Sequence, residues 1–294
     1  MAMKQLDMDA LQVRAQTLAE ALPYLRRFRG ATVVIKYGGA AMIEAGLRAS
    51  VLSDIVLLGL VGMQPILVHG GGPEISEMMK RMGKKPTFID GLRVTDAETA
   101  EIAQMVLVGK TNQAIVSEAC RQGAKAVGLS GKDNGLMLAH KAKSGKAKTD
   151  LGYVGEVEKV NPELLETLVS SGYLPVIAPI GVGPEGETFN INADHVAAAI
   201  AVALKAQKLI LLTDAPGVLL DKKDASTLIS ELSAAKAKRM ILSGQIDAGM
   251  IPKVQACLEA RAGGVESCHI LDGRLPHALL MELFTDVGIG TMVR

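Results

Sequence analysis

From residue 31 onward, short apolar runs rich in β-branched residues alternate with longer segments of helical periodicity. The runs predict parallel strands, and their almost continuous apolar character predicts burial on both faces of a sheet. Helical stretches separate them, as in βαβ units. The predicted strands are 32–36, 65–69, 126–129, 174–180, 209–213 and 267–271, and the predicted helices include 98–121, 162–170, 194–205 and 249–261. The pattern predicts an α/β fold.

Two further segments have the pattern of hairpins. Residues 87–94 and 135–160 place turn residues between short apolar pieces, and hairpins beside a parallel sheet often form lids. The glycine-rich stretch 181–187 (GVGPEGE) is the best candidate for a boundary between two lobes. We therefore expect three parts, which are a helix in 1–29, a first lobe in 30–187 and a second lobe in 188–294.

The first 29 residues contain apolar side chains at helical spacing. One stripe is predicted from Leu11, Ala15, Leu18, Leu22 and Leu25. Pro23 falls inside this pattern and predicts a kink just before it. Such a stripe either covers the chain's own domain or packs against another subunit, and the pattern alone leaves both alternatives open.

Composition narrows the classes of ligand. The chain has 294 residues, which at about 150 residues per domain predicts two domains or one large one. Four Phe, four Tyr and no Trp nearly exclude the stacking platforms that bind single-stranded nucleic acid. The 32 basic and 31 acidic side chains leave a formal charge of +1, which favours neither nucleic acid nor an anionic membrane. A small polar ligand is the better expectation.

The length of the apolar runs and the cysteine content indicate the cellular compartment of the protein. The longest apolar runs, 55–63 and 196–204, have nine residues each, whereas about 20 are needed to span a bilayer. Residues 1–29 carry charged side chains where a signal peptide needs apolar ones, so we expect a cytoplasmic protein without a membrane span. The three cysteines, Cys120, Cys257 and Cys268, include no C-x-x-C pair. We interpret them as small apolar residues rather than a disulfide framework or a zinc site.

Two glycine-rich turns each follow a predicted strand and precede a helix. They are 36–39 (KYGG) and 69–73 (HGGGP). Backbone N–H groups in such turns, together with a helix N-terminus, bind anions. No G-x-G-x-x-G follows the first strand, and 108–111 (VGKT) resembles the end of a Walker A motif but lacks its first glycine. The turns therefore predict a phosphate or carboxylate site of another kind.

Charged and amide side chains adjoin these turns. Lys36 closes the first strand, and Lys253 lies at the start of a helix in GMIPK. A lysine at a strand end is usually only solvated, but beside a glycine turn it is a candidate clamp for an anion. Asn190, Asn192 and Asp194 alternate where a strand enters a helix, so their side chains can point the same way. Asp194 alone would suit a helix N-cap, whereas all three together favour a ligand site.

Six motifs resemble those of the acetylglutamate kinases, a family within the amino acid kinase superfamily. In chain order they are IKYGG (35–39), HGGGPEI (69–75), DGLRVTD (90–96), NINADHVA (190–197), LLTDAPGV (211–218) and GMIPKV (249–254). The resemblance implies an open αβα sandwich with a mainly parallel central sheet, plus a kinked N-terminal helix. It also implies transfer of the γ-phosphoryl group of ATP to the side-chain carboxylate of N-acetyl-L-glutamate, in arginine biosynthesis.

The resemblance also implies roles for individual residues. Lys36 and Lys253 would stabilise the transition state, and Asp194 would organise both lysines. The acceptor would be held by Gly71, Gly72, Arg93, Asn190 and Asn192. The ATP pocket would include Gly38, Gly39, Asp214, Ala215, Gly217 and Met250, with Mg²⁺ carried by the nucleotide and no metal ligand assigned to the protein.

An independent chemical argument agrees with this assignment. A carboxylate with an ordinary pKa near 4.3 is already ionised at pH 7, so it can attack phosphorus without a general base. The remaining difficulty is to bring two anions together, which requires cations and N–H donors around the transferring group. We therefore assign no proton transfer to His69 or His195, and we expect Asp194 to stay ionised between its two lysines.

The N-terminal extension and the C-terminal stretch 268–291 resemble the arginine-sensitive branch of this family. That resemblance implies a homohexamer, built as a trimer of dimers through interlaced N-terminal helices, and L-arginine as an inhibitor. The expected arginine contacts are Glu282, Tyr24, His269 and Gly288, and the alternative for Glu282 is a solvated helix residue. Residues 132–135 (KDNG) depart from the order of many relatives but still predict a tight hairpin turn.

Two other functions remain open from the sequence. A related kinase could phosphorylate another acidic acceptor, such as a carrier-bound aminoadipate. A catalytically silent protein could instead bind arginine and a partner.

Overall fold

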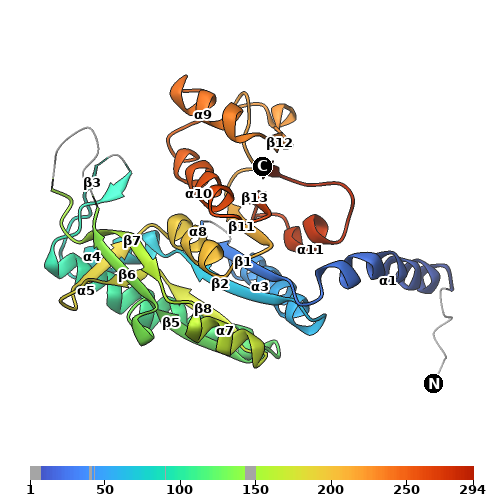
Figure 1. The fold of residues 1–294 in the computed structure, drawn as a ribbon, viewed down its shortest axis with the longest axis horizontal. Helices are drawn as coiled ribbons and strands as arrows, with labels where there is room; N and C mark the ends of the chain where they lie inside the picture. The colour runs from blue at the N-terminus through green and yellow to red at the C-terminus, as the bar shows by residue number, and fades with distance from the viewer. Residues whose placement is uncertain (1–7, 40–41, 43, 90, 143–149) are drawn as a thin grey trace.

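The computed structural model describes residues 8–39, 42, 44–89, 91–142 and 150–294 (Figure 1). Its main sheet has eight strands in the order β12-β14-β13-β11-β1-β2-β8-β5. All six predicted strands lie in this sheet and pair in parallel, and only β14 runs antiparallel to a neighbour, β13. The α/β prediction is confirmed. The strands are β1 (Thr32–Tyr37), β2 (Gln64–His69), β5 (Ala126–Ser130), β8 (Leu174–Ala178), β11 (Lys208–Thr213), β12 (Glu231–Leu232), β13 (Ser267–Asp272) and β14 (Thr291–Val293).

Helices cover both faces of this sheet. Successive strand side chains point to opposite faces, so Val34 joins one core cluster while Val33 and Ile35 join another. The first cluster is closed by α7 (Glu163–Ser170), α8 (Ala193–Ala203), α9 (Ala234–Leu242) and α10 (Ile251–Ala262), and the second by α3 (Ala45–Leu60), α6 (Gln113–Arg121) and α11 (Ala278–Leu283). The result is the αβα sandwich that the resemblance implied.

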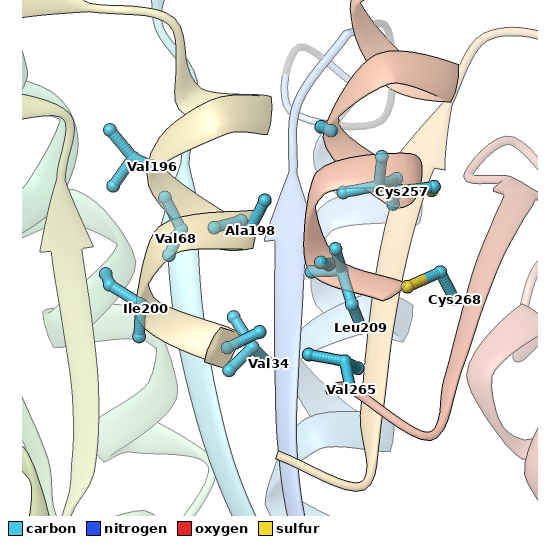
Figure 2. Packing of buried hydrophobic residues seen from close by; sticks show 14 of the residues in the cluster. Val34, Val68, Val196, Ala198, Ile200, Leu209, Cys257, Val265 and Cys268 are labelled. Carbon is cyan, nitrogen blue, oxygen red and sulfur yellow. The ribbon is translucent and has the colours of Figure 1, made fainter. Parts of the chain in front are cut away.

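Two of the three cysteines lie in the first cluster. Figure 2 shows Ala198 of α8 and Cys257 of α10 near Val34 and Leu209 of the sheet. Cys257 and Cys268 are buried, as small apolar residues usually are, whereas Cys120 is exposed and does not fit that interpretation. Ile115 and Ala119 are the buried residues of α6, and the next position is turned by about 100° around the helix axis.

Four strands form a small closed barrel beside the main sheet, in the order β10-β7-β6-β9. They are β6 (Met137–Lys141), β7 (Val154–Val160), β9 (Ile180–Val182) and β10 (Thr188–Ile191). The predicted hairpins are confirmed as β6–β7 and as β3 (Phe88–Ile89) with β4 (Leu92–Arg93). Residues 181–187 link two barrel strands, β9 and β10, and the boundary proposed there stays a prediction.

Two predicted details of these connections are wrong. The strand expected over 174–180 ends at Ala178, and Ile180 begins β9 in the barrel. Pro179 separates the two strands because it has no N–H to donate to a sheet. The turn at 132–135 joins β5 to β6, which lie in different sheets, so it is tight but closes no hairpin. Asn134 and Gly135 make this turn with φ of 52° and 58°.

The helix predicted over 98–121 consists of three parts. It begins with α5 (Ala97–Gln104), capped by Asp96, and ends with α6. Between them lies a π-helix, η1 (Met105–Asn112), which packs with α4 (Gly72–Arg81) over the barrel. Hydrophobic periodicity did not reveal the π-helical part. Short 3₁₀ turns at η2 (Asp133–Gly135) and η3 (Ala225–Thr227) complete the helical elements of the described ranges.

The N-terminal helix α1 (Met8–Phe28) projects away from the rest of the molecule (Figure 1). It continues as one helix through Pro23, and the kink stays a prediction. Phe28 and Tyr24 pack against the second core cluster. In contrast, Leu11, Leu18 and Leu22 are 38%, 74% and 46% exposed, so the stripe does not cover the chain's own domain. No helix in the described ranges is long and apolar enough to cross a membrane.

Candidate active site

Three charged residues from separate elements meet at one point. Lys36 lies at the carboxyl end of β1, Asp194 in the first turn of α8 and Lys253 in the first turn of α10. The two Nζ atoms each lie 3.0 Å from a different Asp194 carboxylate oxygen. Asp194 is only 4% exposed, so the tertiary fold holds the pair of lysines around a buried carboxylate.

The charge balance of this cluster favours an anionic ligand. Burial by itself raises the pKa of Asp194, but the positive charges of Lys36 and Lys253 lower it to about 2. The carboxylate is therefore ionised at neutral pH and neutralises only one of its two lysines. A buried excess of positive charge is unfavourable without a compensating anion. The cluster is thus suited to bind a ligand with negative charge.

The second glycine turn lies beside this cluster. β2 ends at His69, and Gly71 is the N-cap of α4 with a φ of 156°. A Cβ at Gly71 would lie 2.4 Å from Leu107 of η1, so the turn requires glycine here. Gly70 donates its N–H to the Tyr37 carbonyl at 2.8 Å and so joins the two turns. The N-terminus of α4 lies beside the cavity that Lys36 and Asp194 line, and a helix N-terminus favours negative charge.

Arg93 is the third cation of the site. Its Nη2 donates to the Gly72 carbonyl at 2.7 Å and to Ser76 Oγ at 2.8 Å. Its Cζ lies 4.7 Å from the centre of the Phe88 ring, across the β3–β4 hairpin. Burial lowers the pKa of Arg93, and no carboxylate of the described residues pairs with it. Sequence reasoning missed Phe88 and Ser76, although the cross-strand position of Phe88 follows from the predicted hairpin.

One cavity of about 250 Å³ unites the expected acceptor residues. Apolar side chains, including Leu92, Leu107 and Val154, line part of it. Asn192 is the N-cap of α8 and accepts from the Asp194 N–H at 2.8 Å, so the alternative that Asp194 is the cap is wrong. The polar lining comprises Lys36, Gly70, Gly71, Gly72, Arg93, Asn190, Asn192 and Asp194.

The expected nucleotide residues lie in loops at the same edge of the sheet. Gly38 and Gly39 follow β1, and Asp214 follows β11, which pairs with β1. A Cβ at Gly39, where φ is 74°, would lie 2.1 Å from the Asp214 carboxylate, so the two loops are in close contact. Met250 is the N-cap of the helix that carries Lys253. Ala215 and Gly217 continue the loop after β11, and in the described ranges no group of three His, Cys, Asp or Glu could hold a metal ion.

Three of the four expected arginine contacts, His269, Glu282 and Gly288, lie together beside α11. His269 Nδ1 lies 2.7 Å from Glu282 Oε1, while Glu282 Oε2 accepts from the Ile289 N–H at 2.9 Å. The Glu282 side chain is 7% exposed, so the alternative of a solvated residue is wrong. A Cβ at Gly288 would lie 3.7 Å from both Glu282 oxygens.

Tyr24 links α1 to this cluster. Its hydroxyl donates to Asp286 Oδ1 at 2.5 Å. Lys208 adds a positive charge, because its Nζ lies 3.2 Å from His269 Nε2. Sequence reasoning missed Asp286 and Lys208, since no periodicity shows that β11 and the segment after α11 meet. Beside the cluster is a cavity of about 450 Å³ lined by Arg27, Phe28, Arg29, Gly30, Ala31, Gln207, Lys208, Glu266 and Ser267.

Comparisons with known proteins agree with this geometry. Residues 31–272 match the model of the amino acid kinase family. The acetylglutamate kinase of Symbiobacterium thermophilum is 60% identical over 292 residues, which cover 98% of this chain and 99% of the relative. Two structures of N-acetylglutamate synthase from Neisseria gonorrhoeae superimpose well. The complex with coenzyme A and N-acetyl-glutamate has a TM-score of 0.83, 30% identity and coverage of 95% of this chain and 63% of that chain.

The second synthase structure contains coenzyme A and L-arginine, with a TM-score of 0.80, 29% identity and coverage of 95% of this chain and 65% of that chain. Both the family model and the curated relative extend over the residues that build the cavity, the two glycine turns and the lysine cluster. The chain therefore belongs to the amino acid kinase family and, within it, to the acetylglutamate kinases.

Proposed function

We propose that this chain transfers the γ-phosphoryl group of ATP to the side-chain carboxylate of N-acetyl-L-glutamate. The observation that carries the proposal is the buried Asp194 carboxylate holding Lys36 and Lys253 at 3.0 Å each, beside a cavity that also contains Arg93. A relative that shares 60% identity over nearly the whole chain bears the name of this activity.

The acceptor carries two carboxylates, and the site offers cations in two places. The reacting carboxylate would lie near Lys36, where the glycine turn supplies N–H donors. The other carboxylate would pair with Arg93, which has no anionic partner of its own in the described ranges. Asn190 and Asn192 supply amide groups for the acetylamino group, and Leu92, Leu107 and Val154 supply an apolar surface. This division of charge favours a free dicarboxylic amino acid whose amine is acetylated.

The transfer itself requires little proton chemistry. One oxygen of the acceptor carboxylate forms a bond to the γ-phosphorus, and the bond from that phosphorus to the β–γ bridging oxygen breaks, which releases ADP. Lys36 and Lys253 offset the negative charge of the transferring group, and Asp194 keeps both lysines in place before the substrates bind. Gly38, Gly39, Asp214, Ala215, Gly217 and Met250 would surround the nucleotide, whose bound Mg²⁺ would neutralise its phosphates.

An acceptor panel tests this function. ADP release is measured with N-acetylglutamate, glutamate and aspartate as acceptors, each with and without L-arginine. We expect turnover with N-acetylglutamate and little with the two free amino acids, because they place an ammonium group where the acetyl group would bind. A carrier-bound aminoadipate is added as a fourth acceptor, and turnover of that acceptor alone would replace N-acetylglutamate. Binding of arginine without turnover of any acceptor would identify a silent arginine sensor.

We further propose that L-arginine inhibits the enzyme and that the protein is a homohexamer. The buried Glu282 carboxylate pairs with His269, and a guanidinium group could take the place of that partner. Lys208, which contacts His269, links this cluster to a cavity beside α1 that Glu282 itself does not line. A structural relative, the N. gonorrhoeae synthase, has been solved in complex with L-arginine. The exposed stripe of α1 fits a second copy of the same helix, which would form a trimer of dimers. We place the enzyme in the cytoplasm, in keeping with its three free cysteines.

A further inference from the structure

His69 is a buried titratable residue that the proposed reaction does not use. It is the last residue of β2, its exposed fraction is 0%, and it directly precedes the glycine turn. Its Nδ1 lies 2.7 Å from the Gly70 carbonyl oxygen, and its Nε2 lies 3.2 Å from Nδ2 of Asn112, the last residue of the π-helix η1. Both ring nitrogens therefore have a partner inside the protein.

These partners determine where the imidazole carries its proton. A carbonyl oxygen can only accept, so Nδ1 must carry the hydrogen that it shares with Gly70. The Asn112 amide donates to the Val176 carbonyl at 2.8 Å, and its second N–H donates to His69 Nε2. Rotating the Asn112 amide by 180° would place its oxygen against the Val176 carbonyl, which fixes the amide orientation. Burial also lowers the pKa of His69 to about 4, which keeps the ring neutral at physiological pH.

The His69 hydrogen bond fixes the plane of the Gly70–Gly71 peptide. In a trans peptide the C=O and the N–H point in opposite directions, so a carbonyl held toward His69 turns the Gly71 N–H away from it. Gly70 is also held by its own N–H, which donates to Tyr37. The Gly71 N–H has no hydrogen-bond partner within the part of the chain that the structure describes, and Gly71 lines the cavity that contains Lys36 and Asp194.

We propose that His69, held by Asn112, is a positioning residue that orients the Gly70–Gly71 peptide so that the Gly71 N–H points into the cavity as a hydrogen-bond donor to the transferring group. The inference rests on the proposed phosphoryl transfer. A glycine peptide without this restraint rotates easily, because neither residue has a side chain to limit φ and ψ. A donor oriented before the reaction stabilises developing negative charge without the cost of reorganisation.

Two substitutions at the same position test the role of the Nδ1 donor. In His69→Asn the side-chain amide can place an N–H close to the former Nδ1 and can still donate to Gly70, whereas His69→Leu has no donor. We expect His69→Leu to lower kcat by about 10²-fold, with little change in the KM for ATP, as for loss of one oriented N–H donor. His69→Asn should recover most of that loss. Equal kcat values for the two variants, whether high or low, would overturn the proposal.

His140 provides a matched control. It lies on β6 with an exposed ring near Glu156, so His140→Asn and His140→Leu should both keep the wild-type kcat. A loss with His140→Leu as large as with His69→Leu would show a nonspecific effect of removing histidine and would overturn the proposal.

A second measurement does not depend on activity or on folding of the leucine variant. Nitrogen-15 NMR of the histidine rings in the wild-type protein should show the His69 ring, identified as the signal that is missing in His69→Asn, to be neutral and protonated at Nδ1 from pH 5.5 to pH 8. Protonation of the His69 ring at Nε2, or its conversion to an imidazolium in this range, would overturn the proposal. If Lys36→Ala were fully active while His69 kept its Nδ1 proton, the proposed phosphoryl transfer site would be wrong and the hydrogen-bond assignment would stand.

Discussion

At the scale of single residues, the site depends on charges that the fold holds close together. Lys36 and Lys253 each pair with a different oxygen of the Asp194 carboxylate. Removing either lysine therefore removes one positive charge beside the transferring group, while the other lysine keeps its contact with Asp194. Lys36→Ala and Lys253→Ala should each lower kcat by about 10²- to 10³-fold, as loss of a contact made in the transition state does.

Steady-state kinetics at saturating ATP and acceptor check this expectation. Lys141→Ala is the control, since Lys141 is exposed and its one ion pair among the described residues is with Asp150 on the β6–β7 hairpin. Wild-type turnover by either active-site variant would remove that lysine from the reaction.

Arg93 should act on binding of the acceptor rather than on the chemical step. Its planar guanidinium stacks on Phe88 and donates to Gly72 and Ser76, which a lysine cannot do with the same geometry. Arg93→Lys is expected to raise the KM for N-acetylglutamate about tenfold or more, while the KM for ATP changes little. Initial rates over a range of acceptor concentrations measure this, and an unchanged acceptor KM would place Arg93 outside the binding site.

Buried His69 predicts a pH dependence of stability. Its folded-state pKa of about 4 lies below the ordinary 6.5, so its contribution is complete above pH 6.5 and is lost as pH falls toward 4. Between pH 7.5 and pH 5 this one group should reduce the free energy of unfolding by about 2 kcal/mol. Urea unfolding at both pH values measures the change. His69→Asn cannot titrate and should show a smaller decrease, and an equal decrease would contradict the assignment.

At the scale of elements, α1 is a helix that packs against the rest of its own chain only at its C-terminal end. Only its last turns pack against the second core cluster, while its apolar stripe is exposed. Deletion of residues 1–29 should therefore leave an active dimer that L-arginine no longer inhibits. Light scattering and arginine titration of the activity test both parts, and retained hexamers would exclude α1 as the assembly element.

A point variant tests the role of α1 in assembly without removing the helix, so that a folding defect of the truncated protein cannot explain the result. Leu18 is 74% exposed, so Leu18→Asp disturbs no core contact of its own chain and keeps Phe28 in place. It should dissociate hexamers with no loss of thermal stability in the dimer.

The parallel strands and the π-helix show how far the local apolar pattern determines an element. Each predicted parallel strand formed, because a run of apolar residues buried on both faces has few other stable arrangements. The predicted helix over 98–121 did not show the π-helix η1, and the predicted strand over 174–180 continued past the end of β8 at Ala178. The apolar pattern of so short a segment does not distinguish a π-helix from an α-helix, and η1 lies where α4 and strands β5 and β8 pack against it.

At the scale of the whole molecule, the proposed acceptor site and the proposed arginine site lie on one continuous sheet. Lys36 is at the end of β1, and His269 lies in β13, two strands away through β11. If arginine lowers the affinity for N-acetylglutamate, linkage requires N-acetylglutamate to lower the affinity for arginine by the same factor, typically about 5- to 150-fold. Calorimetric titration of each ligand with and without the other measures both factors, and affinities that the other ligand leaves unchanged would contradict a coupling between the two sites.

The sequence by itself determined the parallel strands, the two glycine turns and the residue types that an anion site needs, because these follow from local burial and backbone conformation. The expected acceptor residues came from the resemblance of its motifs to those of the acetylglutamate kinases. Only the tertiary structure decided which groups meet. The contacts of Asp194 with Lys36 and Lys253 join residues more than 50 positions apart, and no local pattern encodes such distances.

The same holds for the groups that sequence reasoning missed. Asn112 reaches His69 only because η1 crosses the end of β2, and Asp286 reaches Tyr24 only because α1 ends beside α11. A side chain's hydrogen-bond partner and its exposure depend on what the folded chain places next to it. Local sequence therefore predicted the elements and the chemistry, and tertiary packing decided the partners, the burial and the exposed face of α1.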